Sequence, residues 1–312
     1  MIIQSSHIAE LLELLENDEP KPSLSLASGY PSLDQQFPDW LYGGQLTVVA
    51  GRPAMGKTAF VHQISNHIAQ DRTSVFVSLE MGADDLIYRA VCANTSLPVH
   101  KLRSPNLLTN EERLQAAFGL ADQGKLNILV EDEAHSLTAI VQRVEQAILE
   151  IKNNALPPLG VIVIDYLQLV SANAANRSLE VGSISRRFKL LAKSLNVPVI
   201  LVSQLNRGLE NRDDKRPILS DLRDSGEIEQ DADAVVFIYR DEVYHPKSRD
   251  QGIAEVIVAK NRYGSTGTSR LHWIAERATF KDEENRPVHE SMSLPSKPTP
   301  RKKISCDEEI FH

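Results

Sequence analysis

Short apolar runs rich in β-branched residues alternate with amphipathic stretches through most of the chain. Runs of this kind predict strands that are buried on both faces, and the helical spacing between them predicts helices that cover a parallel sheet. The pattern therefore predicts a doubly wound α/β domain with a mostly parallel sheet. We expect its strands at residues 46–50, 74–79, 126–130, 160–165, 197–203 and 234–239, and amphipathic helices at 61–68, 141–151 and 181–195.

The pattern changes at both ends of this domain. Residues 253–260 and 268–275, around a turn at 263–267, predict an antiparallel hairpin that closes one edge of the sheet. We place the domain at residues 29–282. The polar, proline-rich residues 283–312 follow it, and their composition predicts a disordered tail.

Residues 1–28 precede the domain as a short helix and a linker. Ser6 can cap the helix, and Ile8, Leu11, Leu12 and Leu15 form an apolar stripe at helical spacing. A helix this short needs a surface to dock on. The prolyl linker at 19–23 favours docking on a neighbouring subunit over docking on its own domain.

The charge balance is acidic, with 42 Asp and Glu against 34 Lys and Arg and a net charge of −8. Any nucleic-acid surface must therefore be local. The two cysteines, Cys92 and Cys306, lie far apart and do not predict a disulfide framework or a zinc site. The chain has no signal-peptide pattern and no apolar run near the roughly 20 residues of a membrane span. We expect a soluble, intracellular protein.

The segment Gly51–Thr58 fits the phosphate-binding pattern G-x-x-x-x-G-K-[ST] between a predicted strand and a predicted helix. Backbone N–H groups at such a helix N-terminus bind phosphate, Lys57 reaches the β- and γ-oxygens, and the Thr58 hydroxyl can ligate Mg²⁺. The alternative, a glycine turn with a surface lysine, fits the long pattern less well. The predicted nucleotide contacts are Gly51, Arg52, Pro53, Ala54, Met55, Gly56, Lys57, Thr58 and Ala59.

Polar residues end several of the predicted strands, where ligands bind in a sheet of this kind. Asp165 is the natural partner of Mg²⁺ held by Thr58, and a helix cap is the alternative. Glu80 suits a carboxylate that polarises the attacking water. Gln204 could contact the γ-phosphate, although a structural amide is also compatible with its position.

Six ordered sequence blocks carry a family resemblance, which spans about residues 29–280. The chain resembles the C-terminal, RecA-like motor domain of the bacterial replicative helicases of the DnaB family, phage and plasmid members included. The resemblance implies a ring, usually a hexamer, that hydrolyses ATP or another NTP with Mg²⁺ at subunit interfaces. Such a ring moves along single-stranded DNA and unwinds duplex during replication, in the cytoplasm of a bacterial cell or of a phage-infected host. The blocks are residues 52–58, 78–81, 164–169, 202–207, 221–231 and 239–244.

The resemblance also implies roles for individual residues. Lys57 and Thr58 would bind phosphate and metal, Glu80 would be the catalytic base, Asp165 the metal-side acid and Gln204 the γ-phosphate contact. Lys260 and Arg262 match the pair that this family inserts into the neighbour's site, and an arginine finger is typically worth about 10³–10⁵ in rate. The alternative for these two cations is a solvated hairpin tip.

For DNA, the resemblance points to the loops at residues 172–187 and 207–226. Arg223, Asp224 and Gly226 match a turn that grips the DNA backbone, although Asp224 replaces a glutamate. A local basic cluster suits phosphate contacts without base reading. Acidic residues are interspersed with it, so a solvated loop is the alternative. The cluster contains Arg207, Arg212, Lys215, Arg216 and Arg223.

The helical N-terminal domain of the family has no counterpart before residue 29, which puts primase contacts in doubt. A helicase loader and other replication proteins are the further partners that the resemblance suggests. Two other functions also fit a phosphate loop and a strand-end acid. One is a RecA-like ATPase that acts as a switch or scaffold, and the other is a loader or inhibitor that imitates a helicase subunit. The block at 221–231 together with Lys260 and Arg262 favours the helicase.

Overall fold

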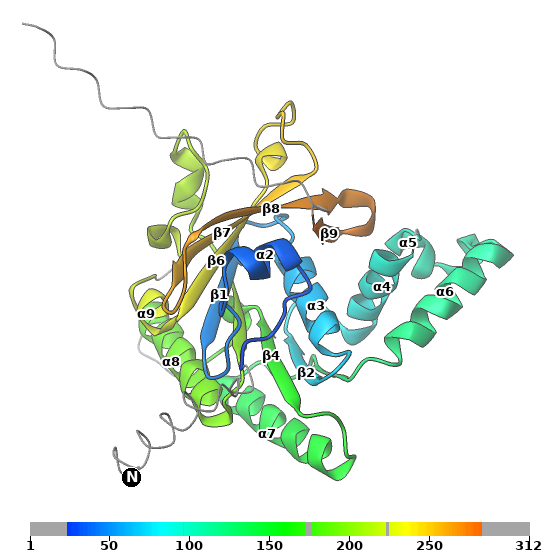
Figure 1. The fold of residues 1–312 in the computed structure, drawn as a ribbon, viewed down its shortest axis with the longest axis horizontal. Coiled ribbons are helices and arrows are strands. Elements are labelled where there is room, and N and C mark those ends of the chain that lie inside the picture. The colour runs from blue at the N-terminus through cyan, green and yellow to red at the C-terminus, as the bar shows by residue number, and fades with distance from the viewer. Residues whose placement is uncertain (1–23, 96, 173–175, 223–224, 283–312) are drawn as a thin grey trace, which may run out of the picture.

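A nine-stranded sheet forms the centre of the computed structural model, which describes residues 24–95, 97–172, 176–222 and 225–282. The strand order is β3-β2-β4-β5-β1-β6-β7-β8-β9, and the first six strands in this order are parallel. Helices cover both faces of the sheet (Figure 1). This confirms the predicted doubly wound α/β fold.

The six parallel strands lie within a few residues of their predicted positions. Five of them are buried, because helices cover both of their faces, whereas β3 is partly exposed because it forms the edge of the sheet. The prediction of a buried strand was therefore wrong for β3. The strands are β1 (Leu46–Gly51), β2 (Thr73–Ser78), β3 (Ile128–Glu131), β4 (Leu159–Asp165), β5 (Val199–Gln204) and β6 (Ala234–Tyr239).

Alternate side chains of these strands enter two hydrophobic cores, one on each face of the sheet. Helices α7 (Leu137–Asn153) and α8 (Arg177–Leu195) pack on one face through residues such as Val144 and Phe188. Helix α3 (Lys57–Ile68) packs on the other face beside α2 (Pro31–Gln36). The three predicted helices are confirmed, although His67 within the first of them is exposed.

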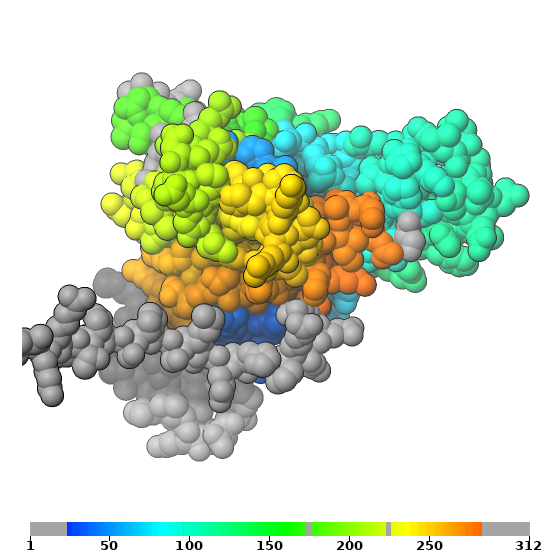
Figure 2. Space-filling view, turned by 90° about the horizontal axis from the view of Figure 1, so that it is seen from above, coloured from blue at the N-terminus to red at the C-terminus, as the bar shows by residue number. Residues whose placement is uncertain are grey.

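Helices α4 (Ala83–Asn94), α5 (Val99–Leu102) and α6 (Asn110–Gln123) project from one side of the domain as a lobe (Figures 1 and 2). Thr109 and Glu112 form a reciprocal capping box at the start of α6. The lobe has a small core of its own around Val91, Cys92 and Leu97. The hydrophobic pattern did not predict these helices.

The predicted hairpin is present as β7 (Ile253–Asn261) and β8 (Gly267–Ile274), antiparallel to each other, with β7 also antiparallel to β6. A further strand, β9 (Thr279–Asp282), pairs with β8 and forms the edge of the sheet in its place. The short helix α9 (Ser225–Asp231) packs against α8. The predicted N-terminal helix at 1–17 and the tail at 283–312 lie outside the described residues.

Candidate nucleotide site

The polar residues that end the predicted strands lie in a row along one edge of the sheet. Strands β2, β4, β5 and β1 are consecutive neighbours, so their carboxyl ends meet there. Asp165 is paired with Ser78, two residues before Glu80, and Gln204 is paired with Gly51 at the start of the phosphate loop. The fold therefore brings Glu80, Asp165 and Gln204 to the same edge as Lys57 and Thr58.

The phosphate loop joins β1 to α3 in a conformation that leaves the helix N-terminus open. Gly56 is the N-cap residue of α3 with φ of +96°, and no side chain caps the first turn. A Cβ on Gly56 would lie 2.7 Å from Phe280 Cζ, and a Cβ on Gly51 would lie 2.9 Å from the Ile238 carbonyl oxygen. Both positions therefore require glycine, and the uncapped N–H groups are available to an anion.

Lys57, the first residue of α3, holds its ammonium group over this loop. Its Nζ donates to the Arg52 carbonyl oxygen at 3.2 Å. Burial lowers the pKa of Lys57, and the nearby carboxylates of Asp165 and Glu80 partly offset that effect. A partly buried cation between two acids and an open helix N-terminus is suited to bind a polyphosphate.

Asp165 is 2% exposed at the end of β4, and the Thr58 hydroxyl donates a hydrogen bond to its carboxylate. Burial raises the pKa of Asp165 to about 6, and the charge of Glu80 adds to this effect. Glu80 itself is exposed. A buried carboxylate beside a threonine hydroxyl is a favourable place for a divalent cation, which would restore the charge balance that burial disturbs.

Gln204 lies between Asp165 and the phosphate loop, and its side chain hydrogen-bonds Tyr166. The side chain of Gln168 links the same strand ends, because it donates to Ser203 Oγ at 2.9 Å and accepts from the Gln204 N–H at 3.1 Å. The sequence reasoning gave no role to Tyr166 or Gln168, although both belong to the block that contains Asp165. Arg89 on α4, whose positive charge also acts on Asp165, was missed as well.

The other predicted nucleotide contacts of the phosphate loop differ in the exposure of their side chains. The side chains of Met55 and Ala59 are buried in the core, so only their backbone faces the loop, whereas Pro53 and Ala54 are exposed. Ala54 has φ of +65°, and its carbonyl accepts a hydrogen bond from Arg240 at 3.0 Å. Arg52 extends its side chain toward the segment that follows β5.

Lys260 and Arg262 lie at the opposite end of the sheet from the phosphate loop. Lys260 on β7 is paired with Val235 on β6, which in turn is paired with Val48 on β1. Both cations therefore lie near the amino-terminal ends of β1 and β6. Lys260 Nζ donates to the carbonyl oxygens of Glu229 and Ala232 at 2.5 and 2.7 Å. The structure does not bring these two cations to their own chain's nucleotide site.

Two arginines of the predicted basic cluster pair with carboxylates of the same chain, and its lysine contacts backbone carbonyl groups. Arg212 pairs with Asp221 at 2.7 Å, and Arg216 makes two hydrogen bonds of 2.7 Å with Glu255. Lys215 donates to the carbonyl oxygens of Glu210 and Arg212. Arg212, Lys215 and Arg216 therefore already have partners within the chain, and their predicted DNA contacts stay predictions.

The remaining DNA candidates give a mixed result. Arg207 is exposed, and within the part of the chain that the structure describes it has no ion-pair partner. Gly226 is exposed near the start of α9. Arg223 and Asp224 lie outside the described residues, so their predicted DNA contacts stay predictions.

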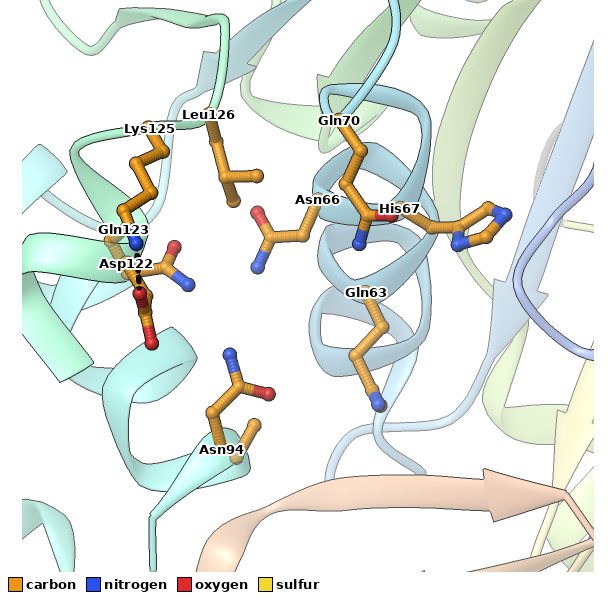
Figure 3. A pocket seen from close by; sticks show the side chains of 10 residues that line it. Gln63, Asn66, His67, Gln70, Asn94, Asp122, Gln123, Lys125 and Leu126 are labelled. Carbon is orange, nitrogen blue, oxygen red and sulfur yellow. Dashed lines mark hydrogen bonds and ion pairs between the residues drawn. The ribbon is translucent and has the colours of Figure 1, made fainter. Parts of the chain in front are cut away.

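A separate polar cavity of about 460 Å³ lies between α3 and the lobe. In Figure 3, Asn66 points from α3 into the space that faces Asp122, Gln123 and Asn94, while His67 points to the other side of the helix. Amide side chains and the Asp122–Lys125 ion pair supply its polar lining. The cavity lies away from the strand ends and lacks their carboxylates, so it is not part of the nucleotide site.

Two negative findings concern the described residues alone. No group of three or more His, Cys, Asp or Glu side chains among them is arranged to hold a metal ion. A cation at Thr58 and Asp165 would therefore need further ligands from a bound nucleotide or from water. None of the described helices combines the length and apolar character that crossing a membrane requires.

Comparison with known proteins places this geometry in a family. The family model of the DnaB-like helicase C-terminal domain matches residues 25–282. The replicative DNA helicase DnaC of Bacillus subtilis is 38% identical over 270 residues, and DnaB of Pasteurella multocida is 40% identical over 276 residues. These alignments cover 84% and 86% of this chain but only 57% and 58% of the two relatives.

Solved structures extend the comparison to the fold. One solved ATPase domain superimposes with a TM-score of 0.79 at 33% identity, and the match covers 90% of this chain and 98% of that one. A DnaB-like replicative helicase superimposes with a TM-score of 0.78, also at 33% identity, over 91% of this chain and 67% of that one. These matches confirm the predicted RecA-like arrangement of the sheet and its helices. Because the family model covers more than half of the sequence, the chain belongs to the DnaB-like helicase C-terminal domain family.

Proposed function

We propose that this chain is the ATP-hydrolysing motor of a ring-forming DNA helicase, which moves along single-stranded DNA and unwinds duplex during replication. The observation that carries the proposal is the row of strand ends, which places Lys57, Thr58, Glu80, Asp165 and Gln204 around one open helix N-terminus. Family membership and the relatives named as replicative helicases support the same activity.

Each residue of the row has a task in nucleotide hydrolysis. Lys57 and the N–H groups of the first turn of α3 bind the phosphates, and Thr58 with Asp165 would hold Mg²⁺, which would neutralise charge on the transferred phosphoryl group. Glu80, exposed beside the buried acid, orients water for attack and accepts its proton. Gln204 lies between the acid and the loop, where an amide can donate to the γ-phosphate.

A ring explains the position of Lys260 and Arg262. Because both lie at the far end of the sheet from their own phosphate loop, they can complete a nucleotide site only on another subunit. The Arg262 side chain is 61% exposed, which leaves it accessible to a neighbour. We therefore propose that the active site is shared across a subunit interface, in the closed ring, usually a hexamer, that the resemblance implies.

The assembly has a second proposed contact. Leu114 and Phe118 are one turn apart on α6 and are 62% and 71% exposed. Large apolar side chains on the outside of a helix suit an interface. The apolar stripe Ile8, Leu11, Leu12 and Leu15 of a second copy has the matching chemistry.

Contact with DNA is proposed for the segment after β5. Arg207 is an exposed cation of that segment, and Gly226 with Arg223 and Asp224 follows it along the chain. A few phosphate contacts of this kind bind single strands without reading sequence, so an acidic protein can make them with a few exposed cations. We also propose that a helicase loader is a partner of this protein. Its proposed location is the cytoplasm of a bacterial cell or of a phage-infected host.

Unwinding of a forked duplex with ATP, measured beside particle mass with and without nucleotide, tests the function. We expect strand separation that requires ATP and Mg²⁺, and a ring-sized particle. Nucleotide hydrolysis without strand separation, by rings that form normally, would instead favour a switch or scaffold ATPase. Failure to hydrolyse nucleotide, combined with entry into the rings of another helicase, would favour a protein that imitates a helicase subunit.

A further inference from the structure

The phosphate loop is tied to the segment after β5 by a single arginine side chain. Arg52 Nε and Nη2 donate to Glu210 Oε1 at 2.9 and 2.6 Å, and Arg52 Nη1 donates to the Leu205 carbonyl oxygen at 2.9 Å. The Arg52 side chain is only 12% exposed, whereas that of Glu210 is 45% exposed. Glu210 therefore holds a largely buried guanidinium group from the solvent side.

A cleft of about 520 Å³ lies between the phosphate loop and the segment after β5. Arg52 and Pro53 line one side of it, and residues 204–207 line the other. The Arg52 side chain extends from the phosphate loop to the other side of this cleft. Its hydrogen bonds therefore connect the phosphate loop directly to η3 (Arg207–Asn211).

The segment on the far side of the cleft is held together by its own contacts. Leu205 forms a β-bridge with Leu222, and the Asn206 N–H donates to the Asp221 carbonyl oxygen at 2.8 Å. Lys215 donates to the Glu210 carbonyl oxygen. A displacement of Glu210 would therefore be transmitted from η3, which contains Arg207, to residue 222, which precedes the proposed DNA turn.

We propose that Glu210 is a positioning residue, which orients the phosphate loop through Arg52 and links nucleotide binding to nucleic-acid binding on residues 205–222. The linkage rests on the proposed function, because it requires that this segment contacts single-stranded DNA. This role requires no contact of Glu210 itself with nucleotide or DNA. It acts by fixing the position of Arg52 relative to both loops, so each ligand shifts the geometry that the other one meets.

The test measures two affinities of the full chain by fluorescence anisotropy, one for a non-hydrolysable ATP analogue and one for an oligothymidylate. The coupling ratio is the Kd for the oligothymidylate without the analogue divided by the Kd with it. E210Q keeps the shape of the side chain and removes its charge. We expect E210Q to weaken binding of the analogue by about two- to fivefold, as for a partly exposed ion pair, and to bring the coupling ratio close to one.

Four further variants make the result specific. D250N removes the partner of Arg270 in an exposed ion pair whose residues do not line the cleft, and it should keep the wild-type coupling ratio. E210D should restore part of the ratio, because it keeps the charge on a shorter side chain. If Glu210 acts through Arg52, adding E210Q to R52M should change the ratio no further than R52M alone.

The outcomes separate this proposal from the proposed function. An E210Q ratio equal to that of the wild type, at an unchanged melting temperature, overturns the linkage, and full additivity of R52M and E210Q shows that Glu210 does not act through Arg52. If the wild type binds no oligothymidylate in any nucleotide state, the proposed function fails. The effect of E210Q on analogue affinity then still decides whether Glu210 positions the loop.

Discussion

Replacing Asp165 with Asn removes a buried charge and keeps the shape of the side chain. Burial raises the pKa of Asp165 from 3.8 to about 6, and the residue is 2% exposed. Each pKa unit corresponds to about 1.4 kcal/mol, so the ionised carboxylate lowers the free energy of unfolding by about 3 kcal/mol. Asn carries no such penalty and can still accept the hydrogen bond from Thr58.

The pH dependence follows from the direction of the shift. Because folding raises this pKa, the penalty is absent below about pH 4, grows between about pH 4 and 6, and is complete above about pH 6. At pH 8, D165N without nucleotide or metal should therefore melt above the wild type by about 6–12 °C, given about 2–4 °C per kcal/mol for a domain of this size. At pH 4 the two proteins should melt together.

Thermal unfolding of both proteins at the two pH values, with and without Mg²⁺ and an ATP analogue, checks the reasoning. The ligands should stabilise the wild type and should stabilise D165N much less, since the carboxylate is the proposed metal ligand. D71N, which changes an exposed carboxylate, controls for the general effect of net charge. A D165N protein that is no more stable at pH 8, or equally favoured at both pH values, would refute the argument.

Three other predictions test the proposed roles. K57A should lose nucleotide binding and hydrolysis, whereas E80Q should bind nucleotide normally and lose at least about 100-fold in turnover, as expected for a general base; equal binding losses in an equilibrium titration would contradict these roles. R262A should hydrolyse nucleotide poorly alone and regain activity when mixed with K57A subunits; mixed rings that stay inactive would place Arg262 outside the shared site. R207A should weaken single-strand binding and flatten its salt dependence more than R212A, because Arg212 is already paired with Asp221; equal effects would remove Arg207 from the DNA surface.

The sequence predicted the parallel part of the fold well because burial on both faces leaves a continuous apolar run, as in β4. It did not predict the lobe or β9. The buried positions of α6 are the small residues Ala116 and Gly119, while Leu114 and Phe118 face outward, so its apolar pattern does not mark the packed side. Strand β9 has only four residues and one large apolar side chain, Phe280, which is too short a pattern to detect.

The candidate nucleotide site was predictable to the extent that it depends on strand ends. Glu80, Asp165 and Gln204 each follow an apolar run, and the parallel topology brings such positions together. The pairing of the basic residues was not predictable, because it depends on contacts distant in sequence. Arg216 meets Glu255 across 39 positions, and Glu210 meets Arg52 across 158.

Lys260 and Arg262, at the far end of the sheet from the phosphate loop, differ in how firmly their side chains are held in place. An ammonium group has three N–H donors, and two of those on Lys260 already cap carbonyl oxygens at the C-terminal end of α9. Arg262, by contrast, meets Asp233 through one side-chain contact of 3.4 Å. Arg262 can therefore turn toward another subunit at little cost. If Lys260 turned toward another subunit, it would lose its hydrogen bonds to the end of α9, and this would destabilise the helix that follows the proposed DNA turn.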